Sequence, residues 1–323
     1  IIDIAVCGLA KRLEMLQNNT KLMIGVSGGL DSTLALLFLH RAAKMLKIED
    51  RILAYTMPGF GTTDRTLKNA VKLMNHMGVQ FETIDIRPAC IQMFKDLNHK
   101  PFGIEWNNET VLSATEKLNN VDPKASDLVF ENVQARTRTN LLMNRGFVIG
   151  TGDLSEIALG WCTYNADHMS MYNPNCSIPK SLVQFIIKYL ADTQGSETLK
   201  SILYDILHTP ISPELLPTNS KGESMQVTES VVGSYELNDF FLFNFIRKGF
   251  SPEKIRFLAK YAKFFADHSE KEVEETLKNF YTRFFRNQFK RNCVPDGPKV
   301  GSVSLSPRGD WRMPSDASSS IWT

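Results

Sequence analysis

Short apolar runs alternate with longer amphipathic segments in the first half of the chain, and this alternation restricts the possible fold more than any other feature. The apolar runs have the length of buried strands and cover residues 22–26, 52–55, 79–86 and 147–149. Helical patterns cover residues 32–46, 63–77 and 131–145. Strands joined by helices of this length form right-handed crossovers and lie parallel in one sheet. The sequence therefore predicts an α/β fold, a Rossmann-like parallel sheet with helices on both faces.

The second half of the chain has a different character, because strand-like runs give way to helical patterns. These patterns continue to Lys290, and the tail over residues 294–323 has no period. At about 150 residues per domain, the length alone favours two domains. The unbroken pattern instead predicts one domain over residues 1–323, with an α/β core over 1–209 and a helical extension and tail over 210–323.

Composition excludes several classes of partner. Lysine plus arginine number 37 and aspartate plus glutamate 35, so the net charge is only +2, which argues against a nucleic-acid partner. Every apolar stretch is far shorter than the roughly 18 residues that span a bilayer, which argues against a membrane partner. Five scattered cysteines without a CxxC pair indicate a reducing, cytoplasmic setting. The chain starts at Ile1 rather than Met, so we expect a further segment before it.

The sharpest motif lies where the first strand meets the first helix. It reads Gly25-Val26-Ser27-Gly28-Gly29-Leu30-Asp31-Ser32. Its glycines let the backbone approach an anion, its serine hydroxyls can donate to that anion, and the helix N-terminus adds free N–H groups. It is neither a Walker A loop nor a dinucleotide fingerprint. An aspartate inside a phosphate cradle indicates Mg²⁺ between the carboxylate and the phosphates. The alternative is a glycine turn in which Asp31 or Ser32 merely caps the helix.

Further polar motifs follow in a fixed order, and the first of these also comes after a predicted strand. They are GTGDLSE at 150–156, LGWCTY at 159–164, PK at 179–180, SPEL at 212–215, FKR at 289–291 and SPRGDWR at 306–312, with ENVQARTR upstream at 131–138. The SGGLDS loop resembles the pyrophosphate-binding loop of the N-type ATP pyrophosphatases. Together the motifs resemble the synthetase domain of the NAD synthetases, specifically the long glutamine-dependent kind, and imply an adenine nucleotide alpha hydrolase-like fold.

The resemblance implies roles for individual residues. ATP would be bound by the loop at 25–32 together with Met57, Thr151, Lys180 and Ser212. Deamido-NAD would be bound by Asn132, Arg136, Glu156, Trp161, Cys162, Thr163, Tyr164 and Lys290. Magnesium would be held by Asp31 and Glu156. The catalytic residues would be Asp31, Glu156, Lys180 and Asp167, the last as a base or an ammonium ligand.

Simpler roles stay open for several of these residues. Trp161 and Tyr164 can be core aromatics, Lys290 a solvated helix end, and Arg136 the partner of a surface acid. For Asp153 we expect only a helix N-cap.

The implied reaction is the ATP-dependent amidation of deamido-NAD (nicotinic acid adenine dinucleotide) to NAD through an acyl-adenylate, with release of AMP and pyrophosphate. The long enzymes take ammonia from glutamine through an N-terminal glutaminase domain, and no such domain is present in these 323 residues; free ammonium is the other source. A homodimer or higher homo-oligomer is expected. The alternatives are another amidating enzyme of the superfamily, such as GMP synthetase, or a nucleotide-binding subunit without turnover.

Overall fold

A parallel sheet organises the first half of the molecule. The computed structural model describes residues 1–106, 109–122, 125–211, 215–217 and 228–323. Within them the sheet has four strands in the order β3-β2-β1-β4. The strands are β1 (Leu22–Gly25), β2 (Ile52–Thr56), β3 (Gln80–Thr83) and β4 (Phe147–Ile149). All neighbouring pairs are parallel, which confirms the predicted α/β architecture.

The strand order determines where a ligand can bind. β1 and β4 are neighbours, although two further strands lie between them in the sequence. The chain leaves β1 toward one side of the sheet and arrives at β4 from the other, so a crevice opens between the loops at their carboxyl ends. These loops carry the two glycine-containing motifs at 25–32 and 150–156.

Alternate residues of the strands face two different cores, as the pleat requires. Leu22 and Ile24 pack in a core with helices from one face of the sheet, whereas Met23 belongs to a separate core on the other face. The helices of the first core are α1 (Ile2–Leu13), α2 (Leu30–Leu46), α3 (Asp64–Met77), α8 (Lys180–Thr193) and α9 (Glu197–Leu207). Those of the second are α4 (Arg87–Asp96), α5 (Val111–Leu118) and α6 (Leu128–Met143).

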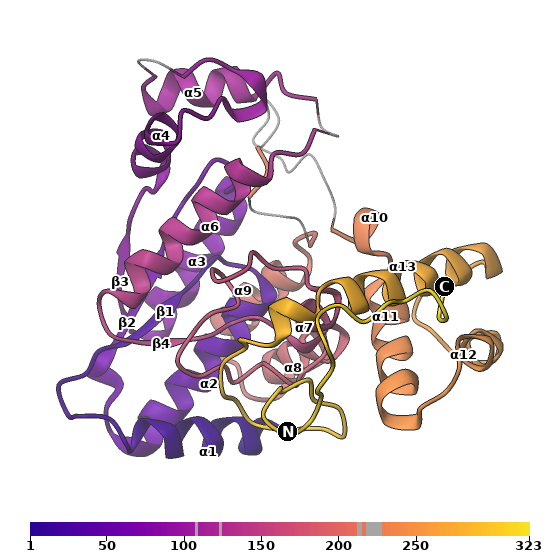
Figure 1. The fold of residues 1–323 in the computed structure, drawn as a ribbon. Helices are drawn as coiled ribbons and strands as arrows, with labels where there is room; N and C mark the ends of the chain where they lie inside the picture. Colours follow the sequence, from indigo (N-terminus) through magenta and orange to yellow (C-terminus); the bar gives the residue numbers. More distant parts are fainter. Residues whose placement is uncertain (107–108, 123–124, 212–214, 218–227) are drawn as a thin grey trace.

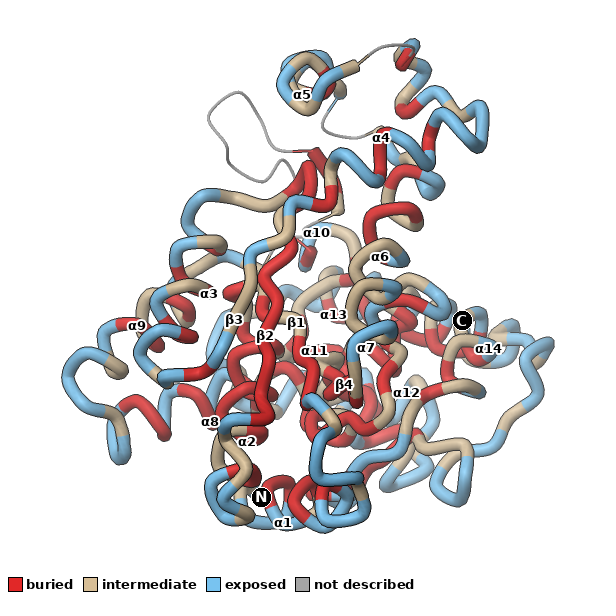
Figure 2. Tube along the Cα trace, turned by 90° about the vertical axis from the view of Figure 1, so that its left-hand side faces the viewer, coloured by how far each residue is buried: buried red, intermediate tan, exposed pale blue. Residues whose placement is uncertain are grey.

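Two of the predicted boundaries are wrong for identifiable reasons. The strand expected over 79–86 is only four residues long, because β3 is an edge strand whose residues are half-buried or exposed, and Figure 2 shows its paler trace beside the buried β1 and β2. The helix expected from Glu131 begins at Leu128 instead. Asp127 caps it by accepting a hydrogen bond from the backbone N–H of Phe130 at 3.0 Å.

The C-terminal helices gather on one side of the sheet (Figure 1). They are α10 (Glu229–Val232), α11 (Tyr235–Leu242) with a π-helical turn (Phe243–Arg247), α12 (Pro252–Ala259), α13 (Glu270–Arg286) and α14 (Gln288–Arg291). The short helix α7 (Leu154–Leu159), which follows β4, packs in their core. The tail returns along this core, where Trp322 stacks on Tyr281 with ring centroids 5.5 Å apart. Among the described residues, no helix is both long and apolar enough to cross a bilayer.

Candidate active site

The loop at 25–32 is held in shape by its own serines. Ser32 Oγ accepts a hydrogen bond from the backbone N–H of Ser27 at 3.2 Å, and Ser27 Oγ accepts one from the N–H of Gly29 at 3.2 Å. Gly28 has a φ of +87°, and a Cβ there would lie 2.0 Å from the carbonyl oxygen of Thr66. Only glycine fits this position, because the loop turns back against helix α3. The turn leaves the N-terminus of α2 open toward the crevice.

A buried asparagine joins this loop to the one that follows β4. Asn175 is fully buried, and its amide Nδ2 donates to the carbonyl oxygens of both Asp31 and Thr151, each at 2.9 Å. Beside it, Asn173 Nδ2 donates to the carbonyl oxygen of Gly152 at 2.7 Å. The polar segment between α7 and Lys180 thus holds the two motif loops together through Asn173 and Asn175.

Lys180 forms the centre of the site. The side chain belongs to the first residue of α8 and is only 1% exposed. Its Nζ lies 2.6 Å from Asp31 Oδ2, 2.8 Å from Asp153 Oδ2 and 3.0 Å from Glu156 Oε1. We call these four residues the ion cluster. They bring together the start of α2, the loop after β4, α7 and α8.

Asp153 has two functions, of which we expected only one. It caps α7, since its Oδ1 accepts a hydrogen bond from the backbone N–H of Glu156 at 2.8 Å, and Glu156 Oε2 accepts in return from the N–H of Asp153. Its other oxygen pairs with Lys180. The sequence did not reveal the pairing with Lys180, because helix capping alone already explains an aspartate at this position.

Burial and charge shift the proton affinities of the ion cluster. Burial would lower the pKa of Lys180, but Asp153, Asp31 and Glu156 raise it well above its usual value. Burial raises the pKa of Glu156 to about 7, in spite of the opposing effect of Lys180. It also raises the pKa of Asp153 well above the ordinary range. Because Lys180 keeps its proton and is shared by three acids, the cluster readily takes up a further positive charge, either a proton or a metal cation.

The same acids offer a metal site. Asp31, Asp153 and Glu156 each present one carboxylate oxygen within 4.8 Å of the others. Within the described part of the chain, the buried Oδ1 of Asp31 has no hydrogen-bond partner. A set of carboxylates with a spare oxygen fits the oxygen-only coordination of Mg²⁺. The expected ligands Asp31 and Glu156 are therefore close enough to share one ion.

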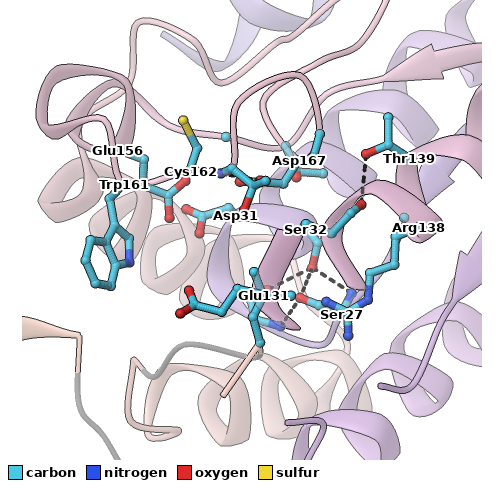
Figure 3. A pocket seen from close by; sticks show the side chains of 18 of the residues that line it. Ser27, Asp31, Ser32, Glu131, Arg138, Thr139, Glu156, Trp161, Cys162 and Asp167 are labelled. Carbon is cyan, nitrogen blue, oxygen red and sulfur yellow. Dashed lines mark hydrogen bonds between the residues drawn. The ribbon is translucent and has the colours of Figure 1, made fainter. Parts of the chain in front are cut away.

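One cavity of about 890 Å³ collects most of the predicted site residues. Figure 3 shows Asp31, Glu156 and Asp167 near one another in this pocket, with Ser27 and Ser32 nearby. The predicted residues that line it are Gly25, Val26, Ser27, Gly29, Leu30, Asp31, Ser32, Met57, Asn132, Arg136, Thr151, Glu156, Trp161, Cys162, Thr163, Tyr164, Asp167, Lys180 and Lys290. Gly28 does not line the cavity, and Ser212 lies outside the described residues.

Comparison with known proteins identifies the family of the chain that forms this site. A family model described as NAD synthase matches residues 5–292. The chain belongs to the NAD synthase family. Within this family, the glutamine-dependent NAD(+) synthetase of Mycobacterium leprae (strain TN) is 43% identical, and the match covers 99% of this chain but 48% of that protein. The protein of the same name from Mycobacterium bovis (strain ATCC BAA-935 / AF2122/97) is 41% identical, with the same coverage of 99% and 48%. The chain thus spans about half the length of the curated relatives that it matches.

Solved structures share the fold of this NAD synthase family member. A glutamine-dependent NAD(+) synthetase from Cytophaga hutchinsonii matches with a TM-score of 0.68 at 14% identity, over 98% of this chain and 53% of the other. The NMN synthetase from Francisella tularensis matches with a TM-score of 0.57 at 20% identity, over 91% of this chain and 95% of the other. At such identities the likeness concerns the fold alone.

In this NAD synthase family member, helix α14 holds the cavity wall formed by residues 160–164. Lys290 Nζ donates to the carbonyl oxygens of Gly160 and Cys162 at 2.8 and 2.7 Å. The wall is thus fixed by a lysine of the same chain, not by a solvated helix end. On the opposite side, Arg136 donates to the carbonyl oxygen of Tyr164 at 3.2 Å, so its partner is the wall instead of a surface acid.

The aromatic residues of the wall differ in exposure. Trp161 is half-buried against the C-terminal helices, and the Arg283 guanidinium lies 5.1 Å from its ring centroid. Tyr164 is 38% exposed, and its ring lies 5.3 Å from that of Phe289. Tyr164 lines the cavity and is too exposed to be a core aromatic.

Replacing Lys180 by methionine tests the ion cluster. We expect Lys180→Met to lower the free energy of unfolding by about 3–5 kcal/mol, because the buried Asp153 and the half-buried Asp31 and Glu156 lose their shared counter-charge. Lys188→Met in the same helix is the matched control, since Lys188 pairs with Asp192 at the surface. Urea unfolding at neutral pH measures both variants. Equal effects of the two substitutions would contradict a central role for Lys180.

Proposed function

We propose that the chain catalyses the ATP-dependent amidation of deamido-NAD to NAD. The observation that carries this proposal is the ion cluster at one end of the cavity, where the two motif loops converge. The names of the relatives, glutamine-dependent NAD(+) synthetases, support the same reaction.

The chemistry explains why a site of this kind is needed. A carboxylate is a poor electrophile, so its oxygen first attacks the α-phosphorus of ATP and the bond to the bridging oxygen breaks, which releases pyrophosphate. Ammonia then attacks the carbonyl carbon, and AMP leaves with the electron pair of the C–O bond. The protein has to hold two polyanions against each other and stabilise the negative charge on the leaving pyrophosphate. Lys180, Ser27 and the N-terminus of α2 line the cavity and would bind that charge.

Asp31 and Glu156 would hold Mg²⁺, and Asp153 lies close enough to join them. When bound, the ion would neutralise phosphate charge next to Lys180. The spare Oδ1 of Asp31 supports this assignment.

Asp167 is the residue that we propose to bind ammonium or to take its proton. Its Oδ1 accepts a hydrogen bond from the backbone N–H of Thr163 at 2.7 Å, which directs the carboxylate along the cavity wall. The protein around the cavity partly desolvates Asp167 and raises its pKa, although the side chain is open to solvent, and a raised pKa makes the group a better base than an aspartate in water. We expect Asp167→Asn to keep ATP–pyrophosphate exchange but to lose NAD formation. Amidation at the original rate would exclude this role.

We propose that the chain corresponds to the synthetase part of its longer relatives. Residues 1–209 would form the ATP-pyrophosphatase core and 210–323 the helical extension. A glutaminase domain would deliver ammonia in a protein of full length, while this chain would use free ammonium. The predicted cytoplasmic setting and homo-oligomer stay predictions.

A direct assay tests the proposed function. Incubation with deamido-NAD, ATP, Mg²⁺ and ammonium should yield NAD, whereas glutamine should be inert as the nitrogen source.

Asp31→Ala should abolish ATP–pyrophosphate exchange, because the variant lacks one of the carboxylates that would hold Mg²⁺. Its circular dichroism spectrum should stay unchanged. Pyrophosphate exchange near the original rate in this variant would contradict the assignment of Asp31.

The same exchange reaction separates the alternatives. Exchange that depends on deamido-NAD supports the proposal, exchange triggered by a different acid points to another amidating enzyme such as GMP synthetase, and binding of ATP without turnover points to a non-catalytic subunit.

Lys290 provides a test of substrate assignment. We expect Lys290→Ala to raise the KM for deamido-NAD roughly tenfold, with little change in the KM for ATP, because the wall at 160–164 loses two charge-assisted hydrogen bonds. The exposed Lys278 on α13 is the matched control, and Lys278→Ala should leave both KM values unchanged. Steady-state kinetics with each substrate varied in turn measures the effects. A parallel rise in both KM values would place the lysine near a different part of the site.

A further inference from the structure

A tyrosine of the helical extension reaches the cavity beside the ion cluster. Tyr235, the first residue of α11, is 3% exposed and lines the cavity. Its hydroxyl has no hydrogen-bond partner within the described residues. A buried hydroxyl without a partner costs free energy, so its presence at a ligand cavity calls for an explanation.

The position of the ring is fixed by its neighbours. Lys180 Nζ lies 5.3 Å from the centroid of the Tyr235 ring. One helical turn further along α11, on the same face, Asp239 accepts hydrogen bonds from the backbone N–H and Oγ of Ser181 at 3.0 and 2.6 Å, and from Ser155 Oγ. Ser155 precedes Glu156 and Ser181 follows Lys180. Asp239 therefore holds α11 next to these two members of the ion cluster.

The chemistry of the surroundings selects the kind of ligand atom. The three cluster carboxylates pair with Lys180, and the Tyr235 hydroxyl donates to none of them, so it remains available as a donor. An anionic oxygen is the strongest acceptor for such a donor. The cavity is expected to receive the triphosphate at this end, where the loop at 25–32 opens.

We propose that the Tyr235 hydroxyl donates a hydrogen bond to an oxygen of the ATP triphosphate, in the part that leaves as pyrophosphate. This assignment rests on the proposed function. It makes the helical extension a contributor to ATP binding, in addition to the loops of the α/β core.

The test removes the hydroxyl alone. We expect Tyr235→Phe to lower kcat/KM for ATP roughly tenfold to a hundredfold, the range for one hydrogen bond to a charged group, and to leave the KM for ammonium unchanged. The rise in Tm that ATP and Mg²⁺ produce without deamido-NAD should also be smaller. The Tm of the ligand-free variant should not fall, because the hydroxyl has no partner to lose.

Tyr281 provides the matched control. It is equally buried, and its hydroxyl also has no partner among the described residues, but it packs among the aromatic residues of the C-terminal core and does not line the cavity. Tyr281→Phe should therefore change neither kcat/KM nor the shift in Tm caused by ATP.

The outcomes separate this inference from the proposed function. An unchanged kcat/KM for ATP and an unchanged Tm shift in Tyr235→Phe would overturn the role of Tyr235, even while the original chain makes NAD. A raised KM for ammonium alone would overturn it as well, since the hydroxyl would then face the nitrogen donor. If the original chain makes no NAD, the proposed function fails, and the ATP-induced Tm shift still decides whether Tyr235 binds the triphosphate.

Discussion

The burial of the Lys180 ammonium is the constraint on which the rest of the structure depends. A lysine with 1% exposure is tolerable only where acids compensate its charge, and here the acids come from separate segments. Asp31 lies in the first turn of helix α2, and Asp153 and Glu156 lie in the loop and helix after β4. The ammonium therefore fixes the distance between two loops of the sheet. Three carboxyl groups surround this single ammonium, an arrangement that suits a further cation and, through that cation, a polyanionic ligand.

The helical extension supports this arrangement from outside the α/β core. Asp239 accepts hydrogen bonds from the first turns of both α7 and α8, and thereby fixes the positions of Glu156 and Lys180 relative to each other. Arg291, 1% exposed, donates to the carbonyl oxygen of Ala158 at 2.9 Å, so the far end of α7 is satisfied by the extension as well. Both ends of the short helix that presents Glu156 thus depend on distant residues, since Asp239 lies 84 positions from Ser155 and Arg291 lies 133 positions from Ala158.

The parts of the site that local sequence patterns encode were predictable, and the parts that rest on long-range contacts were not. The loop at 25–32 has its glycines, serines and aspartate in one run after an apolar strand, so its place followed from the sequence. The partners of Lys180 follow from strand order, which no local pattern specifies. Asn175 and Asp239 each belong to a segment whose pattern looked merely polar or helical. Their functions appear only when the fold brings distant backbone and side-chain groups together.

The anchoring of residues 157–162 by helix α14 has a consequence for how the molecule is made. Asn287 Nδ2 donates to the carbonyl oxygen of Leu159 at 3.0 Å, and Lys290 and Arg291 complete the series of bonds to this segment. A ribosome synthesises the chain from its N-terminus, so both motif loops emerge long before these anchors do. A nascent chain that has not reached residue 287 already contains both motif loops but lacks the side chains that anchor residues 157–162. The cavity wall is therefore anchored only after residues 287–291 have been synthesised, which makes α14 the element that determines when the cavity is complete.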